Sequence, residues 1–550
     1  MLTRKFWQKT YDVIKQAAHM ESVSTIAESQ QQTAALNIDQ SFQQAIEHHQ
    51  AGRLQDAERL YRAILQVQPD HIDTCINLEA LEIQNKLVAL FTEGRFTEAT
   101  ILTQTMTEQF PLNGFGWMMS GMLFRKMGQS TDALAYAQKG AALSPNYAAA
   151  HYNLGNIFVE LGRMDEAEAS FRQALRAKPD YTEANNNLGC ILKNLHRLEE
   201  AEVCYRRTLQ LKPDFAEAYN NLGVILNDMG RINEAEACYQ RALQLKPDYA
   251  EAHNNLGLSL HKLCRLTEAE ANFRRALQLK PDCAEMYGNL GCVLKDQGRL
   301  DESLACLQQQ TMLAPGDSTT LHLIASLTGN NTERAPVQYV ESVFDGYANN
   351  FDTHLQQTLK YEAPERLVEF VVQHLVPTAE KWTVLDLGCG TGLVGMAIAP
   401  FTQQLVGVDL STRMLEKAHA RNVYQRLERL DLLTMMQGEK ALYYDAIFAA
   451  DVFVYLGKLD EIICAIKRLL RPGGVFAFTV EDLVVLRNEE DSQSVQREYQ
   501  LENTGRYTHS VSYLTKLAFD NGFQPKKMIA TQIRMEFGEP VNGYLVLWQS

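Results

Sequence analysis

A glycine-rich turn at Asp386-Leu-Gly388-Cys389-Gly390-Thr-Gly392 directly follows an apolar run that begins at Thr383. Glycine adopts backbone dihedrals that are closed to other residues, and it lets a backbone approach a ligand closely. Together with Gly395, the same glycines spell G-x-G-x-x-G, which is the pattern of a dinucleotide-binding loop. The turn therefore predicts a ligand site, and a nicotinamide dinucleotide is one candidate ligand.

Acidic residues follow at the ends of the next apolar runs. Asp409 lies 23 residues after Asp386, and its carboxylate can accept both hydroxyls of a ribose. Asp431 and Leu432 come after a third short run, and Asp451 ends a fourth. The segment LRPGGVFAF supplies the turn into a fifth.

This ordered set resembles the class I S-adenosylmethionine-dependent methyltransferases. The resemblance implies S-adenosylmethionine as the cofactor, Asp386 near its amino group, Asp409 on its ribose, and Asp431 with Leu432 beside its adenine. It implies further that Asp451 and the loop DVFVYLG border the reaction centre. Asp386 before the first glycine, the later acids in order and a terminal hairpin favour this interpretation over the dinucleotide one. The cofactor-binding residues predicted in this way are Asp386, Gly388, Cys389, Gly390, Gly392, Asp409, Leu410, Asp431, Leu432 and Asp451.

Catalytic candidates are few, because methyl transfer from an activated sulfonium mainly requires that donor and acceptor be held in line. His509 is a candidate general base, since its ordinary pKa suits proton removal near neutral pH, and Asp451 is a second candidate. The alternative for His509 is a histidine bonded to the backbone. Arg506 and Tyr507 are candidates for binding substrate or partner, whereas arginines such as Arg506 are by default surface or paired residues.

Two further features bear on the site. The lead-in segment resembles helices that cover a donor site, which makes Phe344, Tyr347, Phe351 and Tyr361 candidates for a lid, with plain core as the alternative. Ser510 is placed to cap the helix that follows it. The chain holds 10 cysteines but no Cys-x-x-Cys pair, so we expect no metal site.

The elements that position these residues are short β-branched runs alternating with amphipathic helices. This alternation predicts a parallel sheet flanked by helices, with strands in TVLDLG, QLVGVDL, YDAIFAAD and GVFAFTVE. A late antiparallel pair is expected in KKMIATQIR and GYLVLWQ. The composition NNTERAP, before this region, is typical of a linker.

The preceding half of the chain repeats every 34 residues. Each unit has an apolar helix with Leu-Gly, a turn built on Gly-Arg or a variant, a second helix with a small residue, and a closing proline. Proline cannot continue a helix, and small residues let paired helices approach closely. The pattern resembles the tetratricopeptide repeat, with copies at Leu154, Leu188, Leu222, Leu256 and Leu290 and a degenerate stretch at about 72–113.

One column of this repeat offers side-chain amides. Asparagine precedes Leu-Gly in five successive units, at Asn153, Asn187, Asn221, Asn255 and Asn289. The array resembles the superhelix of O-GlcNAc transferase, which implies that these amides face a groove and bind the backbone of a protein or peptide partner. The alternative is that the asparagines act locally, or are carried along by duplication.

We therefore expect a multidomain chain in which an all-α tetratricopeptide solenoid precedes an α/β, Rossmann-like class I methyltransferase domain. The expected divisions are an N-terminal helix and flexible linker at 1–36, the solenoid at 37–327, a linker and lead-in at 328–340, and the catalytic domain at 341–550. A net charge of −15 argues against nucleic acid as a partner, and no apolar stretch approaches the roughly 20 residues of a membrane helix. We expect a cytoplasmic protein.

Three hypotheses remain open at this point. The solenoid recruits a protein or peptide that is then methylated, or it only docks an enzyme that acts on a metabolite, lipid or glycan. In the third, a non-catalytic scaffold carries a domain that senses the donor.

Overall fold

The computed structural model describes residues 38–50, 52–347, 362–374, 381–483, 497–536 and 539–550. The chain divides into two compact units, Met1–Ile225 and Leu226–Ser550, and the division falls inside helix α12 (Ala216–Asp228). Each unit is described by itself. Within the described residues, no helix is both long and apolar enough to cross a membrane.

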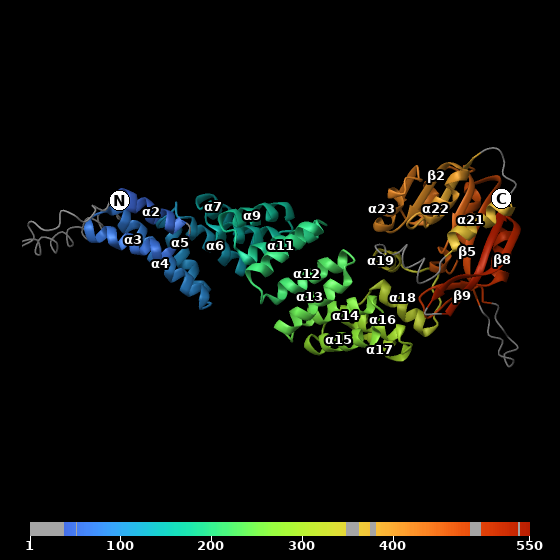
Figure 1. Ribbon diagram of the computed structural model, residues 1–550, viewed down its shortest axis with the longest axis horizontal. Helices are drawn as coiled ribbons and strands as arrows, with labels where there is room; N and C mark the ends of the chain where they lie inside the picture. Colours follow the sequence, from blue (N-terminus) through green and yellow to red (C-terminus); the bar gives the residue numbers. More distant parts are fainter. Residues whose placement is uncertain (1–37, 51, 348–361, 375–380, 484–496, 537–538) are drawn as a thin grey trace, which may run out of the picture. The chain divides into compact units, whose positions relative to one another are not determined.

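The first unit is built from helices that pack as consecutive pairs (Figure 1). Its helices are α2 (Ile38–Gln50), α3 (Leu54–Val67), α4 (Ile72–Thr92), α5 (Phe96–Gln109), α6 (Gly114–Lys126), α7 (Ser130–Leu143), α8 (Ala148–Glu160), α9 (Met164–Ala177), α10 (Thr182–Asn194) and α11 (Leu198–Leu211). The stretch expected to be degenerate, about 72–113, is helical but departs from the other units, because α4 has 21 residues where the corresponding helix α8 has 13.

Small residues in the pairs do what their spacing predicts. A Cβ at Gly155 of α8 would lie 2.7 Å from the ring of Phe171 in α9, so only glycine fits there. Ala167 and Ala174 of α9 are fully buried in the same interface. The close packing of α8 against α9 therefore depends on a glycine that faces an aromatic ring.

The second unit continues the helix pairs and then changes to a sheet. The repeat helices here are α13 (Ile232–Leu245), α14 (Ala250–Lys262), α15 (Leu266–Leu279), α16 (Ala284–Asp296), α17 (Leu300–Leu313) and α18 (Ser318–Thr328). Asp317 caps α18 by accepting hydrogen bonds from the amides of Thr319 and Thr320, and Gly329 ends it with a left-handed residue.

A nine-stranded sheet forms the rest of this unit, in the order β3-β2-β1-β4-β5-β7-β6, with β9 paired to β5 and β8 to β9. Strands β1 to β5 are parallel to one another, whereas β9 runs antiparallel to both β5 and β8. The strands are β1 (Trp382–Leu387), β2 (Thr402–Asp409), β3 (Arg426–Arg429), β4 (Tyr444–Ala449), β5 (Leu470–Asp482), β6 (Tyr499–Leu501), β7 (Tyr507–His509), β8 (Gln524–Glu536) and β9 (Glu539–Gln549).

All the strands expected from the sequence are present, and two were not expected. The short strands β6 and β7 are polar and aromatic, so they lack the β-branched run that marks the others. The segment expected to be a turn into the fifth strand is already part of β5, with Gly473 at φ +81°.

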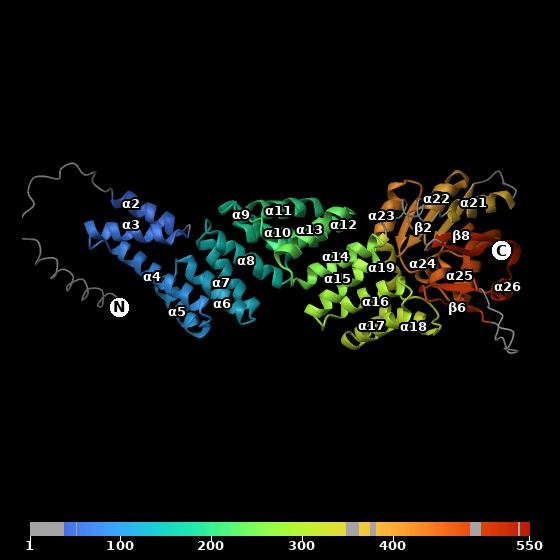
Figure 2. The ribbon, with the colours of Figure 1, turned by 60° about the horizontal axis from the view of Figure 1, so that its bottom comes forward.

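Helices cover both faces of the sheet (Figure 2). They are α19 (Val337–Tyr347), α21 (Ala363–His374), α22 (Leu393–Ile398), α23 (Thr412–Ala420), α24 (Leu432–Gly438), α25 (Asp460–Leu469) and α26 (Val511–Asp520), with short 3-10 turns η1 (Ala399–Phe401) and η2 (Phe453–Tyr455). Side chains of α24, α25 and α26 pack on one face, and those of α21 and α22 on the other. Alternate strand residues point to the two cores, as Leu385 and Val384 do.

Candidate functional site

The predicted cofactor residues lie at one edge of the sheet. Strands β3, β2, β1 and β4 are adjacent and parallel, so their carboxyl ends meet at the same edge. Asp386 lies near the end of β1, Asp409 ends β2, and Asp431 and Asp451 each follow their strands by two residues. In open α/β sheets, ligands bind at such an edge, where the strand order reverses. Here that reversal lies between β1 and β4.

The glycine turn has the backbone shape that its sequence predicts. Gly388, Gly390 and Gly392 all have positive φ, of +64°, +51° and +89°. A Cβ at Gly390 would find no atom within 4 Å, so this stretch of backbone presents an open face. At Gly390 the turn therefore leaves room for a ligand to approach the backbone closely.

Asp409 is held in place by that turn. Its Oδ2 accepts a hydrogen bond from the Gly390 amide at 2.8 Å, and its Oδ1 accepts one from the Ser411 amide at 2.9 Å. Burial raises the pKa of Asp409, while these backbone bonds oppose the rise. Each carboxylate oxygen has a second lone-pair site, so the oriented group can still accept a ribose hydroxyl.

Asp386 is buried beside the turn and has a partner that the sequence did not reveal. The Tyr424 hydroxyl donates to its Oδ2 at 2.6 Å. Burial raises the pKa of Asp386 to about 7. A Cβ at Gly395 would collide with the Tyr424 hydroxyl, so the third glycine of the dinucleotide pattern makes room for this tyrosine. Tyr424 stands in a loop before β3, where an aromatic residue carries no recognisable signal.

The remaining cofactor candidates have structural partners. Asp431 caps α24, and its Oδ1 accepts from the Leu433 amide at 3.0 Å. Leu432 is half-buried against the sheet core. The Leu410 carbonyl accepts from Arg429 at 3.1 Å, and the buried Cys389 anchors the turn to β2 through a bond from its amide to the Val408 carbonyl. Burial raises the pKa of the Cys389 thiol, which disfavours the nucleophilic thiolate form.

The lead-in helix α19 contacts the Asp409 end of the site. Ser411 donates its hydroxyl to Asp345 at 2.5 Å, and Arg413 donates to the Asp345 carbonyl at 3.3 Å. Phe344 meets Tyr455 edge to face, with ring centroids 5.5 Å apart. The other lid candidates, the Tyr347 side chain, Phe351 and Tyr361, lie outside the described residues.

At the end of β4, Asp451 belongs to a cluster of charged side chains. Asp451 has φ +55°, and its amide donates to Thr479 Oγ1 at 2.8 Å. Arg534, which is buried, donates to Asp451 Oδ2 at 3.2 Å and also bonds Glu481. Tyr455 hydrogen-bonds Arg506 nearby. We call Asp451, Tyr455, Glu481, Arg506 and Arg534 the Asp451 cluster.

The cluster contains a buried arginine, Arg534, and an acid that the sequence did not single out, Glu481. Arg534 sits between two carboxylates, so its charge is balanced within the protein. Burial raises the pKa of Glu481, and Arg534 opposes that rise. Glu481 went unrecognised in the sequence, although an acid near the end of β5 follows the same rule as Asp451 after β4.

His509 and Tyr507 lie inside the protein. Nε2 of His509 donates to the Gly457 carbonyl at 3.0 Å, and the residue is fully buried. Burial lowers the pKa of His509 to about 4, so the ring is neutral near pH 7. This placement favours the backbone-bonded alternative over a general base. Tyr507 is also fully buried, with its hydroxyl 2.5 Å from Thr332 Oγ1, and we assign it to packing instead of partner binding. Ser510 caps α26, which confirms that prediction.

The asparagine column joins neighbouring repeats. In the first unit, Asn187 donates to Asn156 Oδ1 at 2.9 Å, Asn221 donates to Asn186 Oδ1 at 3.3 Å, and Asn153 contacts Met122 Sδ. In the second unit, Asn289 donates to Asn254 Oδ1 at 2.9 Å, and Asn255 is half-buried. These bonds give the amides a local role between repeats, whether or not they also meet a partner.

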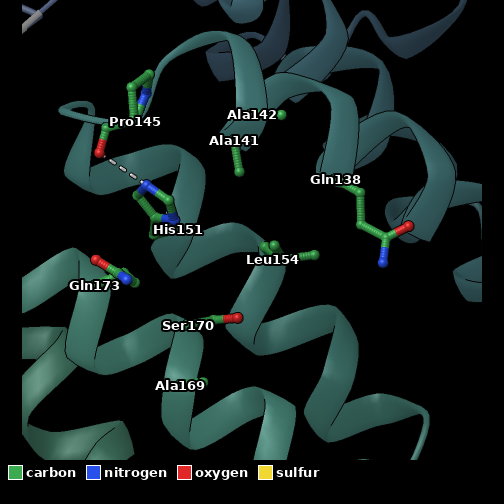
Figure 3. A pocket seen from close by; sticks show the side chains of 9 residues that line it. All are labelled: Gln138, Ala141, Ala142, Pro145, His151, Leu154, Ala169, Ser170 and Gln173. Atoms are coloured by element: carbon green, nitrogen blue, oxygen red, sulfur yellow. Dashed lines mark hydrogen bonds between the residues drawn. The ribbon is translucent and has the colours of Figure 1, made fainter.

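A hollow of the first unit lies elsewhere on the repeats (Figure 3). Helices α7, α8 and α9 surround it, and Ala141, Ala142 and Leu154 supply apolar lining. His151 lies at its side and bonds the Pro145 carbonyl at 2.9 Å. The residues that line the hollow do not include Asn153, so it is distinct from the asparagine column.

Comparisons with known families match both halves. Residues 385–476 match a family model described as a methyltransferase domain. Residues 76–324 match the tetratricopeptide-type model of the cilia and flagella-associated protein 70 C-terminal domain. The first match decides between the two interpretations of the glycine turn in favour of the methyltransferase.

Individual relatives are similar over the sheet domain. Human methyltransferase-like protein 27 is 35% identical over 165 residues, which are 29% of this chain and 62% of that protein. Sterol 24-C-methyltransferase of Debaryomyces hansenii is 32% identical over 116 residues, which are 20% of this chain and 30% of that protein. The chain thus spans less than two thirds of the length of either relative.

Among solved structures, the hetero-tetramer Cut9-Hcn1 of the APC/C is similar over 52% of this chain and 55% of that chain, with 18% identity and a TM-score of 0.39. The helix pairs and the sheet order described above, together with the two family matches, give the architecture. The chain is a tetratricopeptide-repeat solenoid fused to a Rossmann-like methyltransferase domain.

Proposed function

We propose that the chain is an S-adenosylmethionine-dependent methyltransferase and that its repeat array recruits the protein or peptide that is methylated. The observation that carries the proposal is the set of acids at the carboxyl ends of β1, β2, β3 and β4, beside a glycine turn whose three glycines have positive φ. When bound, the donor supplies an activated methyl group on sulfur.

The residues of the chain then have distinct tasks. Asp409, fixed by two backbone amides, accepts the ribose hydroxyls. Asp386 lies where the amino group of the donor is expected, and Tyr424 orients its carboxylate. Asp431, which caps α24, and Leu432 are the residues that we propose to lie beside the adenine. Holding the two reactants in line can supply roughly 7–11 kcal/mol of the barrier, so no dedicated base is required for an acceptor that is already nucleophilic.

Recruitment by the repeats is the finer part of the proposal. It is supported by the match of residues 76–324 to a tetratricopeptide-type family, since solenoids of this kind present extended surfaces to partners. The amides of Asn187 and Asn221 are only half-buried, so they remain accessible beside their bonds to the preceding repeat.

The experiment is to incubate the full chain with donor labelled in its methyl group and a cell lysate, and then to fractionate by size. The proposal predicts label in macromolecules. Label only in small molecules would contradict the recruitment of a protein acceptor. Donor binding without any transfer would contradict catalysis and favour a sensor.

A double variant tests whether the asparagines recruit the acceptor. Replacing Asn187 and Asn221 together with alanine should lower labelling of macromolecules at least several-fold, because both amides are lost to the partner. Asn77→Ala is the matched control, since the Asn77 amide donates to the Asp73 carbonyl within its own helix. Equal labelling by the double variant and the control would remove the asparagines from recruitment.

A further inference from the structure

The segment that joins the repeats to the sheet domain is bonded to that domain along its length. Ala335 donates its amide to the Tyr455 carbonyl at 2.9 Å. The Glu333 carbonyl accepts from the amides of Gly457 and Lys458, each at 2.9 Å. Residues 333–335 thereby act as a short antiparallel partner of residues 455–458, and Arg334 forms a bridge with Leu456. The segment expected to be a linker is thus hydrogen-bonded to the sheet domain, and we call residues 331–335 the joining segment.

A single side chain of the joining segment holds the edge strand β6. Asn331 Oδ1 accepts from the Leu501 amide at 2.7 Å, and Asn331 Nδ2 donates to the Tyr499 carbonyl at 3.0 Å. A primary amide carries the same donor and acceptor as a peptide group, so Asn331 continues the hydrogen bonding of the sheet edge.

The last repeat helix holds the turn that follows β6. His322 of α18 donates from Nε2 to the Gly505 carbonyl at 3.0 Å. Tyr339 packs against the same turn, because a Cβ at Gly505 would lie 2.5 Å from its hydroxyl. Leu323, Tyr339, Tyr455, Leu501 and Tyr507 share one hydrophobic core.

The two segments held in this way carry two members of the Asp451 cluster. Tyr455 lies on η2, Arg506 lies in the turn between β6 and β7, and the two side chains are hydrogen-bonded to each other. His509 ties the segments together through the Gly457 carbonyl. The cluster lies at the ends of β4 and β5, beyond the donor-binding ends of β1 and β2, which is where an acceptor must approach the donor.

We propose that the joining segment is a positioning element for the acceptor side of the site, with Asn331 as its principal residue. This inference rests on the proposed function. The repeats then do more than tether the enzyme. The joining segment and α18 fix the backbone segments that carry Tyr455 and Arg506. The two bonds of Asn331 reach only Tyr499 and Leu501 and do not touch the glycine turn or Asp409, so we expect donor binding to change little when Asn331 is replaced.

The test compares the full chain with Asn331→Ala and with the control Asn330→Ala, whose amide donates to Thr328 Oγ1. Three measurements are made on each: hydrogen exchange of peptides that cover 453–458 and 499–507, binding of S-adenosylhomocysteine by calorimetry, and the KM and kcat of methyl transfer into the lysate fraction that the unmodified chain labels. Asn331→Asp serves as a partial rescue, because it keeps the acceptor for the Leu501 amide.

For Asn331→Ala we expect exchange of 499–507 to quicken at least tenfold, the Kd for S-adenosylhomocysteine to stay within twofold, and KM for the acceptor to rise at least tenfold. For Asn331→Asp, the exchange rate and the KM should lie between those of Asn331→Ala and the unmodified chain. For Asn330→Ala, both should equal those of the unmodified chain. Unchanged KM and kcat despite faster exchange would overturn the positioning role, as would a loss of S-adenosylhomocysteine binding in step with transfer. An unmodified chain that labels nothing would instead refute the proposed function itself, and this inference with it.

Discussion

At the scale of single residues, the site depends on side chains whose orientation is fixed before any ligand binds. Two backbone amides hold the Asp409 carboxylate, and a tyrosine hydroxyl holds that of Asp386. Preorganised groups of this kind lose little freedom when a ligand binds, so more of each hydrogen bond contributes to affinity.

Burial of His509 makes stability depend on pH. Its pKa is about 4 in the folded chain, against an ordinary value of 6.5, so the unfolded state binds the proton more readily. The contribution of a buried neutral histidine is therefore complete above about pH 6.5 and is lost as the pH falls toward 4. Relative to His509→Gln, the unmodified chain should lose on the order of 3 kcal/mol between those limits.

Urea denaturation of both proteins at several pH values across that window measures this difference. The His151→Gln variant is the control, since His151 lies on the repeats and bonds the Pro145 carbonyl. Denaturation midpoints that fall in parallel for the unmodified chain and His509→Gln would contradict the assignment.

Residue types decided how much of the site could be predicted. The shared location of Asp386, the glycines, Asp409, Asp431 and Asp451 was predictable, because each lies at or just after the end of a strand, and parallel strands bring their carboxyl ends to one edge. Tyr424 and Asn331 were not, because their roles come from contacts between segments far apart in the sequence. His509 looked available for proton transfer in the sequence, and only the packing of β6 and β7 shows that it is buried.

At the scale of elements, one turn position of the repeat shows how a local rule can be broken. The residue between paired helices has positive φ in every unit from Gly52 to Gly298 that the structure describes, and it is glycine in all but two. His196 and Cys264 stand at this position with φ 57° and 56°. A residue with a Cβ costs roughly 1–2 kcal/mol in this left-handed conformation. Replacing it with glycine removes that cost, but glycine is more flexible in the unfolded chain, so part of the gain in stability is lost on folding.

We therefore expect Cys264→Gly to stabilise the chain by about 1 kcal/mol. Cys264 is exposed, so no packing is lost with its thiol. Thermal denaturation measures the change, and the reverse substitution Gly298→Ala, at the same turn one repeat later, should lower the midpoint. A lower midpoint for Cys264→Gly would show that its thiol makes a contact worth more than the backbone strain.

The elements themselves were largely predictable, because the 34-residue period and the alternating strands each have a clear signature. The joining segment was not. Asn, Thr, Glu, Arg and Pro in succession are typical of a loop, and nothing in that composition reveals that the backbone pairs with residues 455–458. Bonds of this kind depend on the tertiary arrangement and leave no periodic pattern.

At the scale of the whole molecule, the second unit unites the last repeats with the sheet domain. Its shared core includes Leu307 and Leu323 from the repeats and Val454, Leu501 and Tyr507 from the sheet domain, all of them buried. Burying one large apolar side chain stabilises a fold by about 1.5–3 kcal/mol, so this core is a substantial part of the stability of the domain.

A chain that begins at residue 337 should consequently be less stable than one that begins at residue 226. The shorter chain lacks α18 and the joining segment, which exposes Val454, Tyr455 and Leu501. We expect a lower thermal midpoint and increased binding of a dye specific for exposed apolar surface. Equal midpoints would show that the sheet domain is complete without the repeats.

The proposed function requires the edge formed by β1 to β4 to bind the methyl donor. Calorimetry of S-adenosylhomocysteine with the full chain measures this binding, beside Asp409→Ala and the control Asp520→Ala, whose carboxylate lies at the exposed end of α26. We expect one site per chain and an affinity at least tenfold weaker in Asp409→Ala, since a charged hydrogen bond contributes about 1.5–3 kcal/mol. Asp520→Ala should bind like the unmodified chain. No binding by the unmodified chain, or full affinity in Asp409→Ala, would mean that the donor does not bind at this edge.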